Sequence, residues 1–290
     1  MNNKKYGIIS LRKQFPNDGV CLDFIFDTLH SRKCNCGGTY KRIKGRRQFY
    51  CSKCLNQIAP TAGTIFHKSD TPLSLWFHAI MVFSNAKSGI SAKTIQRDLE
   101  ITYKTAWHML TRIRKALKQS EEALRGDVEM DAGYFGGRFK SGKDNARQSE
   151  AMQAKAVVMA AVERKGQMRA SVVPDATAET HKNFLWQNVS TKGTRLMTDK
   201  ANRYDKIALG YDRHFVDHHK GEYARGDVHI ANVETFWSHI KRSIKGTHKV
   251  VSKKHLQSYL DGFVWHYNAR TYNDAERFAA LLGALLRPAR

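Results

Sequence analysis

From Pro72 onward, apolar residues recur at the three- to four-residue interval of helices that bury one face. The first run predicts a well-buried helix. Ser91 and Thr102 each precede a further run and are typical N-cap residues, so we predict helices over 92–99 and 103–117. The residues expected to form the buried stripe of these two helices are Ile95, Leu99, Ile101, Ala106, Leu110, Ile113 and Leu117.

Beyond residue 126 the pattern changes to the alternation typical of β-strands. The glycines at 136 and 137 suit a tight turn after the first strand. Three strands in hairpin order, followed by helix, strand, helix, strand and helix, form the element order of a ribonuclease-H-like α/β domain. We predict strands over 127–131, 154–162, 167–173, 194–199 and 213–217, and helices over 178–189 and 231–246.

The chain is strongly basic. Its 290 residues contain 49 Lys and Arg against 26 Asp and Glu, a formal net charge of +23. Such an excess attracts polyanions, so it favours nucleic acid or an acidic membrane as a partner over the role of an ordinary metabolic enzyme. Hydrophobic residues make up 41% of the chain, enough to build packed cores, which argues against disorder.

The apolar stretches are too short for a membrane helix. The longest, 75–83 and 278–286, cover about nine residues each, whereas a transmembrane helix needs about 20. Near the N-terminus only Ile8 and Ile9 are available for the apolar region of a signal peptide, which is too few. We therefore expect a cytoplasmic, reducing location, associated with the nucleoid if the partner is DNA.

Four of the five cysteines form two close pairs. Cys34 and Cys36 are separated from Cys51 and Cys54 by fourteen residues, which include a glycine pair at 37–38 and a predicted strand over 47–50. This layout predicts a zinc ribbon in which four thiolates hold one structural Zn²⁺. Two disulfides or free redox thiols are the alternatives, and a reducing compartment disfavours the disulfides. Cys21 stands apart and is expected to be a small buried apolar residue.

Two helices joined by the short segment 100–102 are typical of a helix-turn-helix, whose second helix enters the major groove of DNA. The alternative is a plain helical hairpin with a basic, solvated face. A basic run between the cysteine pairs allows the same two interpretations, phosphate contact or a solvated hairpin. Two further basic residues lie on the helix predicted over 231–246. The candidate DNA contacts are Lys41, Arg42, Arg46 and Arg47 between the cysteine pairs, Lys104, His108 and Arg112 on the second helix, and Arg242 and Lys245 on the helix 231–246.

Three acids can converge in the α/β region. Asp131 on the first strand and Asp199 at the end of the fourth would be neighbours if these strands pair in parallel. Glu234 and Lys241 share one flank of the helix 231–246. Three close carboxylates repel one another, and two Mg²⁺ or Mn²⁺ ions would relieve that repulsion and suit phosphodiester chemistry. Lys241 would then hold a phosphate.

Other assignments of the acidic and histidine residues remain open. Any one member of the triad could be an ordinary surface or capping carboxylate, as could the other candidate acids. Asp217, His218, His219 and His229 could form a metal site, although substrate contact or packing is favoured because adjacent strand residues point to opposite faces. The other candidate acids are Asp205, Asp217, Glu222 and Asp227.

The chain contains several short motifs in the order in which they occur in a known family. In this respect it resembles insertion-sequence transposases of the DDE type that carry an N-terminal zinc ribbon, the ISXO-like group. The resemblance implies a bacterial transposase that binds the terminal inverted repeats of its element, cleaves DNA with Mg²⁺ and joins the ends to target DNA, as a dimer or higher oligomer. It carries the catalytic roles to Asp131, Asp199, Glu234 and Lys241. The motifs are 61–66, 89–91, 103–107, 129–131, 134–137, 220–223, 234–238, 241–242 and 246–248.

The chain departs from the family pattern at two places. Ala132 and Gly133 stand where the family commonly has Glu-Thr, and Ala231 stands where it often has Asn. The neighbouring Asn232 is therefore a candidate to replace or assist Glu234. A catalytically inactive or domesticated copy that only binds DNA is the alternative function, and a nuclease that cleaves without joining is a third.

Together these patterns predict an α/β chain of three regions. Residues 1–66 would form the zinc ribbon with an N-terminal extension, and 67–120 the helix-turn-helix region. Residues 121–290 would form the ribonuclease-H-like catalytic domain with C-terminal helices.

Overall fold

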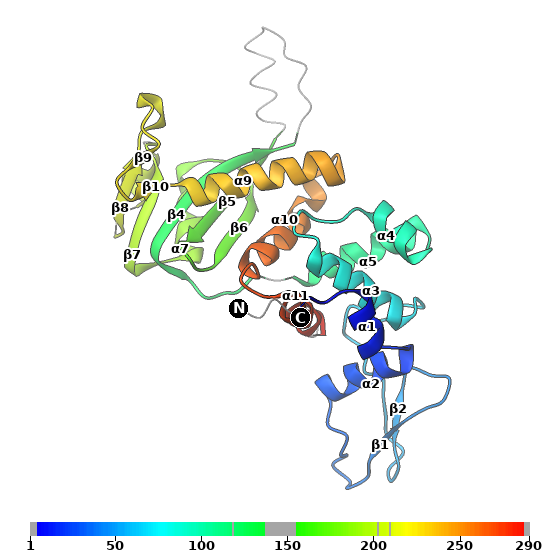
Figure 1. Ribbon diagram of the computed structural model, residues 1–290. Coiled ribbons are helices and arrows are strands. Elements are labelled where there is room, and N and C mark those ends of the chain that lie inside the picture. Colours follow the sequence, from blue (N-terminus) through cyan, green and yellow to red (C-terminus); the bar gives the residue numbers. More distant parts are fainter. Residues whose placement is uncertain (1–4, 118, 137–154, 202, 209, 287–290) are drawn as a thin grey trace. The chain divides into compact units, whose positions relative to one another are not determined.

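The computed structural model describes residues 5–117, 119–136, 155–201, 203–208 and 210–286 (Figure 1). Gly137 of the expected glycine turn and the first residue of the strand expected over 154–162 lie outside these ranges. The chain divides into two compact units. Unit 1 comprises 1–117 and 271–290, and unit 2 comprises 118–270.

Unit 1 combines a small antiparallel sheet with helices. The sheet has the order β1-β2-β3, and α11 packs against α3. Asp18 at the start of α2 accepts hydrogen bonds from the backbone N–H groups of Leu73 (2.8 Å) and Ser74 (2.9 Å), so it caps α3 from another helix. The elements are α1 (Ile8–Gln14), α2 (Asp18–Leu29), β1 (Tyr40–Arg42), β2 (Phe49–Cys51), β3 (Gln57–Ile58), α3 (Leu73–Asn85), α4 (Ala92–Leu99), α5 (Tyr103–Ala116) and α11 (Asp274–Leu286).

The helices predicted in unit 1 are confirmed, with their caps. The Ser91 side chain accepts a hydrogen bond from the Thr94 backbone, and the Thr102 side chain accepts one from the Thr105 backbone. Glu100 adopts a left-handed conformation (φ 53°) that ends α4. The expected stripe is buried except for Ile101, which is only partly buried.

Unit 2 is built on a mixed five-stranded sheet of order β6-β5-β4-β7-β8. Neighbours pair antiparallel from β6 to β4 and parallel from β4 to β8, which is consistent with a ribonuclease-H-like domain. The elements are β4 (Leu124–Phe135), β5 (Ala156–Glu163), β6 (Met168–Val173), α7 (Ala178–Asn188), β7 (Val189–Asp199), α8 (Arg203–Ile207), β8 (Asp212–Val216), the 3₁₀ turn η1 (His218–Lys220), β9 (Ala224–Arg225), β10 (Val228–His229), α9 (Ala231–Ser243), the π-helical turn η2 (Ile244–His248) and α10 (Lys253–Asn268).

The strands of unit 2 differ in length from the predicted ones. The first strand extends to Phe135 because it pairs with β5 along its whole C-terminal half, ending at the pair Phe135 and Ala156. β7 begins at Val189, five residues before the predicted start at 194. The last predicted helix keeps its α-helical geometry only to Ser243 and then changes to the π form.

The two faces of this sheet are covered by different helices. Alternate residues of β4 point to opposite faces. Val128 and Met130 join a core cluster with α7 and α8. Phe135 joins the cluster that contains the buried faces of α9 and α10, and Figure 1 shows α9 lying along the sheet. Glu129, Asp131 and Gly133 therefore face α9.

The free edge of β6 is paired by side-chain amides instead of another strand. Gln119 both donates to the Ala170 carbonyl (2.6 Å) and accepts from the Ala170 N–H (2.9 Å). Asn268 accepts from the Met168 N–H (2.8 Å), and Gln257 accepts from the Val172 N–H (2.7 Å). These edge groups are thus satisfied, which disfavours pairing with a foreign strand. Of the helices described, none has the length and apolar character that crossing a membrane requires.

Candidate zinc and carboxylate sites

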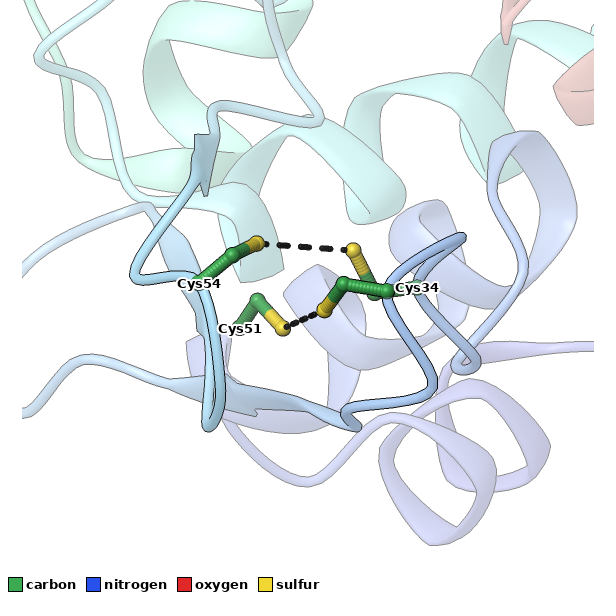
Figure 2. Close-up of side chains that lie close together, drawn as sticks. Cys34, Cys51 and Cys54 are labelled. Atoms are coloured by element: carbon green, nitrogen blue, oxygen red, sulfur yellow. Dashed lines mark hydrogen bonds between the residues drawn. The ribbon is translucent and has the colours of Figure 1, made fainter.

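The four paired cysteines of unit 1 converge as predicted. Their sulfur atoms all lie within 4.8 Å of one another. The Cys34 and Cys54 sulfurs are 3.7 Å apart, and those of Cys36 and Cys51 are 3.4 Å apart (Figure 2). Four thiolates at about 2.3 Å from one Zn²⁺ in a tetrahedron are about 3.8 Å from each other. The cluster therefore fits a structural zinc ion, which would be held by all four sulfurs.

Local backbone turns present these sulfurs. The Cys34 N–H donates to the Gly38 carbonyl (2.9 Å), and the Lys53 N–H donates to the Cys51 sulfur (3.4 Å). A Cβ at Gly38 would lie 2.5 Å from that sulfur, so only glycine fits there. The Cys36 N–H and the Tyr40 hydroxyl lower the pKa of the Cys34 thiol to about 6, which favours the thiolate that binds metal.

The fifth cysteine has a different environment. Cys21 lies on α2 and is fully buried, and burial raises the pKa of its thiol to about 12. This confirms the expectation of a small apolar core residue.

The candidate DNA contacts of unit 1 differ in how far they are free to reach a ligand. Lys41, Arg46, Lys104 and His108 are exposed. Arg112 instead donates to the carbonyls of Ile65 (3.0 Å) and His67 (2.9 Å), and Arg47 donates to those of Ser69 and Thr71. Arg42 forms an ion pair with Asp23 at 3.3 Å.

Asp131 lies on β4 beneath α9. Its carboxylate accepts a hydrogen bond from the Trp237 indole N–H at 3.0 Å, across 106 positions of the sequence. Burial raises the pKa of Asp131 to about 6, and the charges of Asp199 and Glu234 act in the same direction. The structure thus brings the three predicted acids close enough for their charges to interact.

Each of the other two acids comes from its predicted element. Asp199 ends β7, which pairs in parallel with β4, and lies opposite Val216 of β8. Glu234 lies in the first turn of α9, and its side chain is 46% exposed. Among the described residues, the cysteines are the one group of three or more ligand side chains within 4.8 Å of one another. The carboxylates are therefore more widely spaced than the sulfurs.

The competing acids differ from the triad in their partners. Asp205 pairs with Arg213 (2.6 Å) and Asp217 with Lys200 (3.0 Å). Within the part of the chain that the structure describes, no basic side chain forms an ion pair with Asp131 or Asp199. The remaining two competitors also have partners, Glu222 with Arg225 and Asp227 with Arg195.

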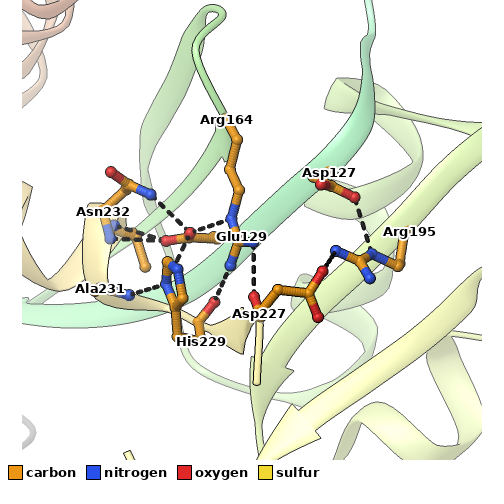
Figure 3. Close-up of polar contacts among 9 residues, drawn as sticks. Asp127, Glu129, Arg164, Arg195, Asp227, His229, Ala231 and Asn232 are labelled. Carbon is orange, nitrogen blue, oxygen red and sulfur yellow. Dashed lines mark hydrogen bonds and ion pairs between the residues drawn. The ribbon is translucent and has the colours of Figure 1, made fainter. Parts of the chain in front are cut away.

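Glu129 is a further residue of this region, one for which the sequence predicts no role. Its side chain is completely buried, two positions before Asp131 on the same face of β4. Its carboxylate accepts from the backbone N–H groups of Asn232 (2.8 Å) and Val233 (3.3 Å) at the N-terminus of α9 (Figure 3). Favourable interaction of a carboxylate with a helix N-terminus therefore fixes α9 on β4.

Arg164, at the turn between β5 and β6, balances the charge of Glu129. Its Nε donates to Glu129 at 2.8 Å, while its terminal nitrogens donate to the carbonyls of Asp227 (2.7 Å) and His229 (3.0 Å). A second arginine, Arg195, bridges Asp127 and Asp227. Figure 3 shows these contacts joining β4, β7 and the segment before α9.

One feature of the sequence could have identified Glu129, namely a charged residue on the covered face of a strand. By two-residue alternation it shares the face of Asp131, at a position where a covered strand normally carries an apolar residue. Asn232, the reserve candidate for the third acid, uses its side-chain amide to donate to Glu129 at 2.8 Å.

The candidate histidines lie in different settings. His229 faces Glu129, with its Nδ1 atom 3.3 Å from the carboxylate. His218 lies closer to the triad, with its Nδ1 atom 3.9 Å from a carboxylate oxygen of Glu234. His219 is exposed on η1. As far as the described residues extend, these histidines form no group of three or more ligands with Asp217.

The basic candidates of α9 lie on its solvent side. Lys241 and Arg242 of α9 and Lys245 of the following turn η2 are exposed, as is the flank of α9 that carries Glu234. The Lys241 ammonium lies 5.8 Å from the centroid of the Phe135 ring at the end of β4. The N-terminus of α9 thus lies at Glu129, Trp237 at Asp131 and Lys241 near Phe135, so α9 runs along β4 in the same direction as the strand.

Comparison with known proteins supports a single family. The chain is 25% identical over 238 residues to an uncharacterized protein in transposable element ISH50 of Halobacterium salinarum, a match that covers 78% of this chain and 79% of the relative. That relative is archaeal, so the expectation of a bacterial origin gains no support from it. A model of the ISXO2-like transposase domain matches residues 123–268. Since this match spans half of the chain and includes the whole five-stranded sheet with α9 and α10, the chain belongs to the ISXO2-like DDE transposase family.

Proposed function

We propose that this protein is an active transposase that binds the terminal inverted repeats of its insertion sequence and carries out metal-dependent DNA cleavage and strand transfer. The observation that supports this most strongly is the difference in charge compensation. The four competing acids have basic partners, whereas Asp131 and Asp199 have no such partner among the described residues. Uncompensated neighbouring carboxylates suit a site that divalent cations complete.

In this proposal Asp131, Asp199 and Glu234 hold two Mg²⁺ or Mn²⁺ ions. Carboxylate oxygens are the ligands these hard cations prefer. When bound, the ions would activate the attacking oxygen and stabilise the leaving oxygen of a phosphodiester. Trp237 orients Asp131 through its indole N–H, and Lys241 holds a phosphate of the DNA.

Glu234, and not Asn232, is the third acid of the proposed site. The Asn232 amide is engaged with Glu129, so its role is to fix α9 in place. Glu234 projects from the first turn of the same helix with a partly exposed carboxylate, which leaves it available to a metal ion.

The proposed DNA-binding regions are the zinc ribbon in residues 1–66 and the helix-turn-helix in 67–120. The proposed catalytic region is 121–270, because residues 271–290, which were expected to belong to it, are part of unit 1. The exposed Lys41, Arg46, Lys104 and His108 would contact DNA directly. Arg42, Arg47 and Arg112 would do so with the donors left over from their internal contacts. Arg242 and Lys245 would bind phosphates beside the triad. We propose that the protein acts in the cytoplasm, as a dimer or higher oligomer on DNA.

The test is strand transfer of a labelled element end by the purified full chain with Mg²⁺ or Mn²⁺. We expect Asp199→Asn to lower the rate of strand transfer by more than about 100-fold. Substitution of a residue that only supports a metal ligand costs up to about 100-fold, and loss of the ligand itself should cost more. Asp205→Asn is the matched control, because this acid is 65% exposed and paired with Arg213. Full activity of Asp199→Asn would refute the assignment.

The same assay distinguishes the alternatives. A wild-type protein that binds the ends but neither cleaves nor joins them would be a DNA-binding copy without catalysis. Cleaved but never joined products would indicate a nuclease. Binding should weaken steeply with salt, because each neutralised phosphate contributes a log–log slope of about −0.9.

A further inference from the structure

The segment between β8 and α9 carries an exposed aromatic ring beside the proposed catalytic acids. The Tyr223 side chain is 68% exposed. One side of its ring lies against the His218 imidazole, with the two ring centroids 5.2 Å apart and an interplanar angle of 34°. The same imidazole lies 3.9 Å from Glu234. A line of contacts therefore runs from Glu234 through His218 to the solvent-exposed ring of Tyr223.

The backbone holds Tyr223 in this position. The Gly221 N–H donates to the His218 carbonyl and the Glu222 N–H to the Asp217 carbonyl, both at 3.1 Å. Gly221 has a φ of 72°, which reverses the chain and brings Tyr223 back over His218. Asp217 is in turn anchored by Lys200 at 3.0 Å. The ring is thus presented by an ordered turn.

Packing of the core does not account for this ring. Neither core cluster of unit 2 includes Tyr223, and the Nε2 atom of His218 is buried without a hydrogen-bond partner among the described residues. His218 is therefore held by its ring contact and its approach to Glu234. Trp186 is the other strongly exposed aromatic ring in the described part of unit 2, and there a lysine, Lys182, lies over the ring at 4.4 Å.

We propose that Tyr223, supported by His218, is a stacking platform for a nucleobase next to the phosphate that is cleaved. This inference rests on the proposed function, since it places the phosphate at Asp131, Asp199 and Glu234. Bases inside a duplex already stack on their neighbours, so the platform receives a base that has left the stack at the cleavage junction. Every base offers an aromatic face, and stacking on a protein ring strengthens binding by about tenfold.

The test is a double-mutant cycle between protein and DNA. Affinity of the full chain is measured without Mg²⁺ for element ends that carry an abasic site at each position flanking the cleaved bond in turn. We expect one abasic position to weaken binding of the wild type by about tenfold and to have no effect on Tyr223→Ala. Tyr223→Phe keeps the ring and should respond like the wild type.

Trp186→Ala is the matched control, because it removes an exposed ring from the same unit and should keep the wild-type response. If no abasic position affects the wild type, or if the effect persists in Tyr223→Ala, the platform is refuted. In that case normal strand transfer by the wild type would leave the proposed function intact. Failure of the wild type to bind or process its ends would overturn both proposals.

Discussion

The two candidate sites of this chain are assembled in opposite ways. The cysteine site of unit 1 is formed by two short turns around β1 and β2, and its sulfurs already lie at distances suited to one tetrahedral ion. The carboxylate site of unit 2 draws its members from β4, β7 and α9. Its acids are more widely spaced, and they rely on contacts such as that between Trp237 and Asp131, 106 positions apart.

This difference shows where each site gets its geometry. In the cysteine cluster all four ligands lie within one small module, so metal binding would be coupled directly to the folding of that module. In the carboxylate cluster, the buried Glu129 and the partly buried Arg164 position α9 before any ligand binds. Changes at the first site should therefore act on metal content, and changes at the second on the scaffold.

The largest effect is expected from loss of zinc. Cys51→Ser, or treatment with a chelator, should remove a contribution of roughly 10–16 kcal/mol and unfold the β1 to β3 sheet. Metal analysis should give one zinc per wild-type chain and almost none for the variant, with faster proteolysis between Cys34 and Cys54. Cys21→Ala should keep its zinc. Equal zinc content in Cys51→Ser and the wild type would contradict the four-sulfur site.

A smaller effect, confined to unit 2, is expected from Glu129→Ala. The change leaves Arg164 and the N-terminus of α9 without their buried acceptor, and breaking such a pair costs about 3–5 kcal/mol. Urea unfolding should show this loss, while the zinc content stays at the wild-type value. Strand transfer should fall as α9 loses its position.

The matched control is Asp127→Ala on the same strand. Asp127 is 41% exposed and pairs with Arg195, and surface pairs of this kind contribute about 0–1 kcal/mol. If Glu129→Ala were no more destabilising than Asp127→Ala, Glu129 would not be the residue that fixes α9.

The features that could be predicted from the sequence are those that depend on contacts between residues close together in the chain. The caps Ser91 and Thr102 act within one helical turn, so the starts of α4 and α5 follow from neighbouring residues. The cysteine cluster likewise depends on spacing within one small module. The approach of Asp131 to Asp199 followed from a single assumption, parallel pairing of their strands, which the structure confirms.

The remaining features depend on contacts between distant segments. The first strand was expected to end at 131, yet pairing with β5 carries it on to Phe135. Helices α1 and α2 were not predicted. The role of Glu129 depends on α9, whose N-terminal N–H groups bind its carboxylate although they lie 103 positions later in the chain. The alternation within β4 indicates that a charge at this position is unusual, but it does not identify α9 as the partner of that charge.

The last comparison uses a matched pair of glycine substitutions, one at each site, and the smallest effect is expected from the one in unit 2. Gly38→Ala would place a methyl group 2.5 Å from the Cys51 sulfur, so a zinc ligand must move and zinc should be lost. Gly133→Ala would place one 3.1 Å from the Trp237 indole, which rests on β4 at this glycine. That ring can shift by tenths of an ångström, at a cost in the lower part of the 1–3 kcal/mol range for overpacking. Zinc analysis and urea unfolding of both variants measure the contrast. Zinc loss in Gly133→Ala, or full zinc content in Gly38→Ala, would mean that the two sites do not differ in the way their ligands are held.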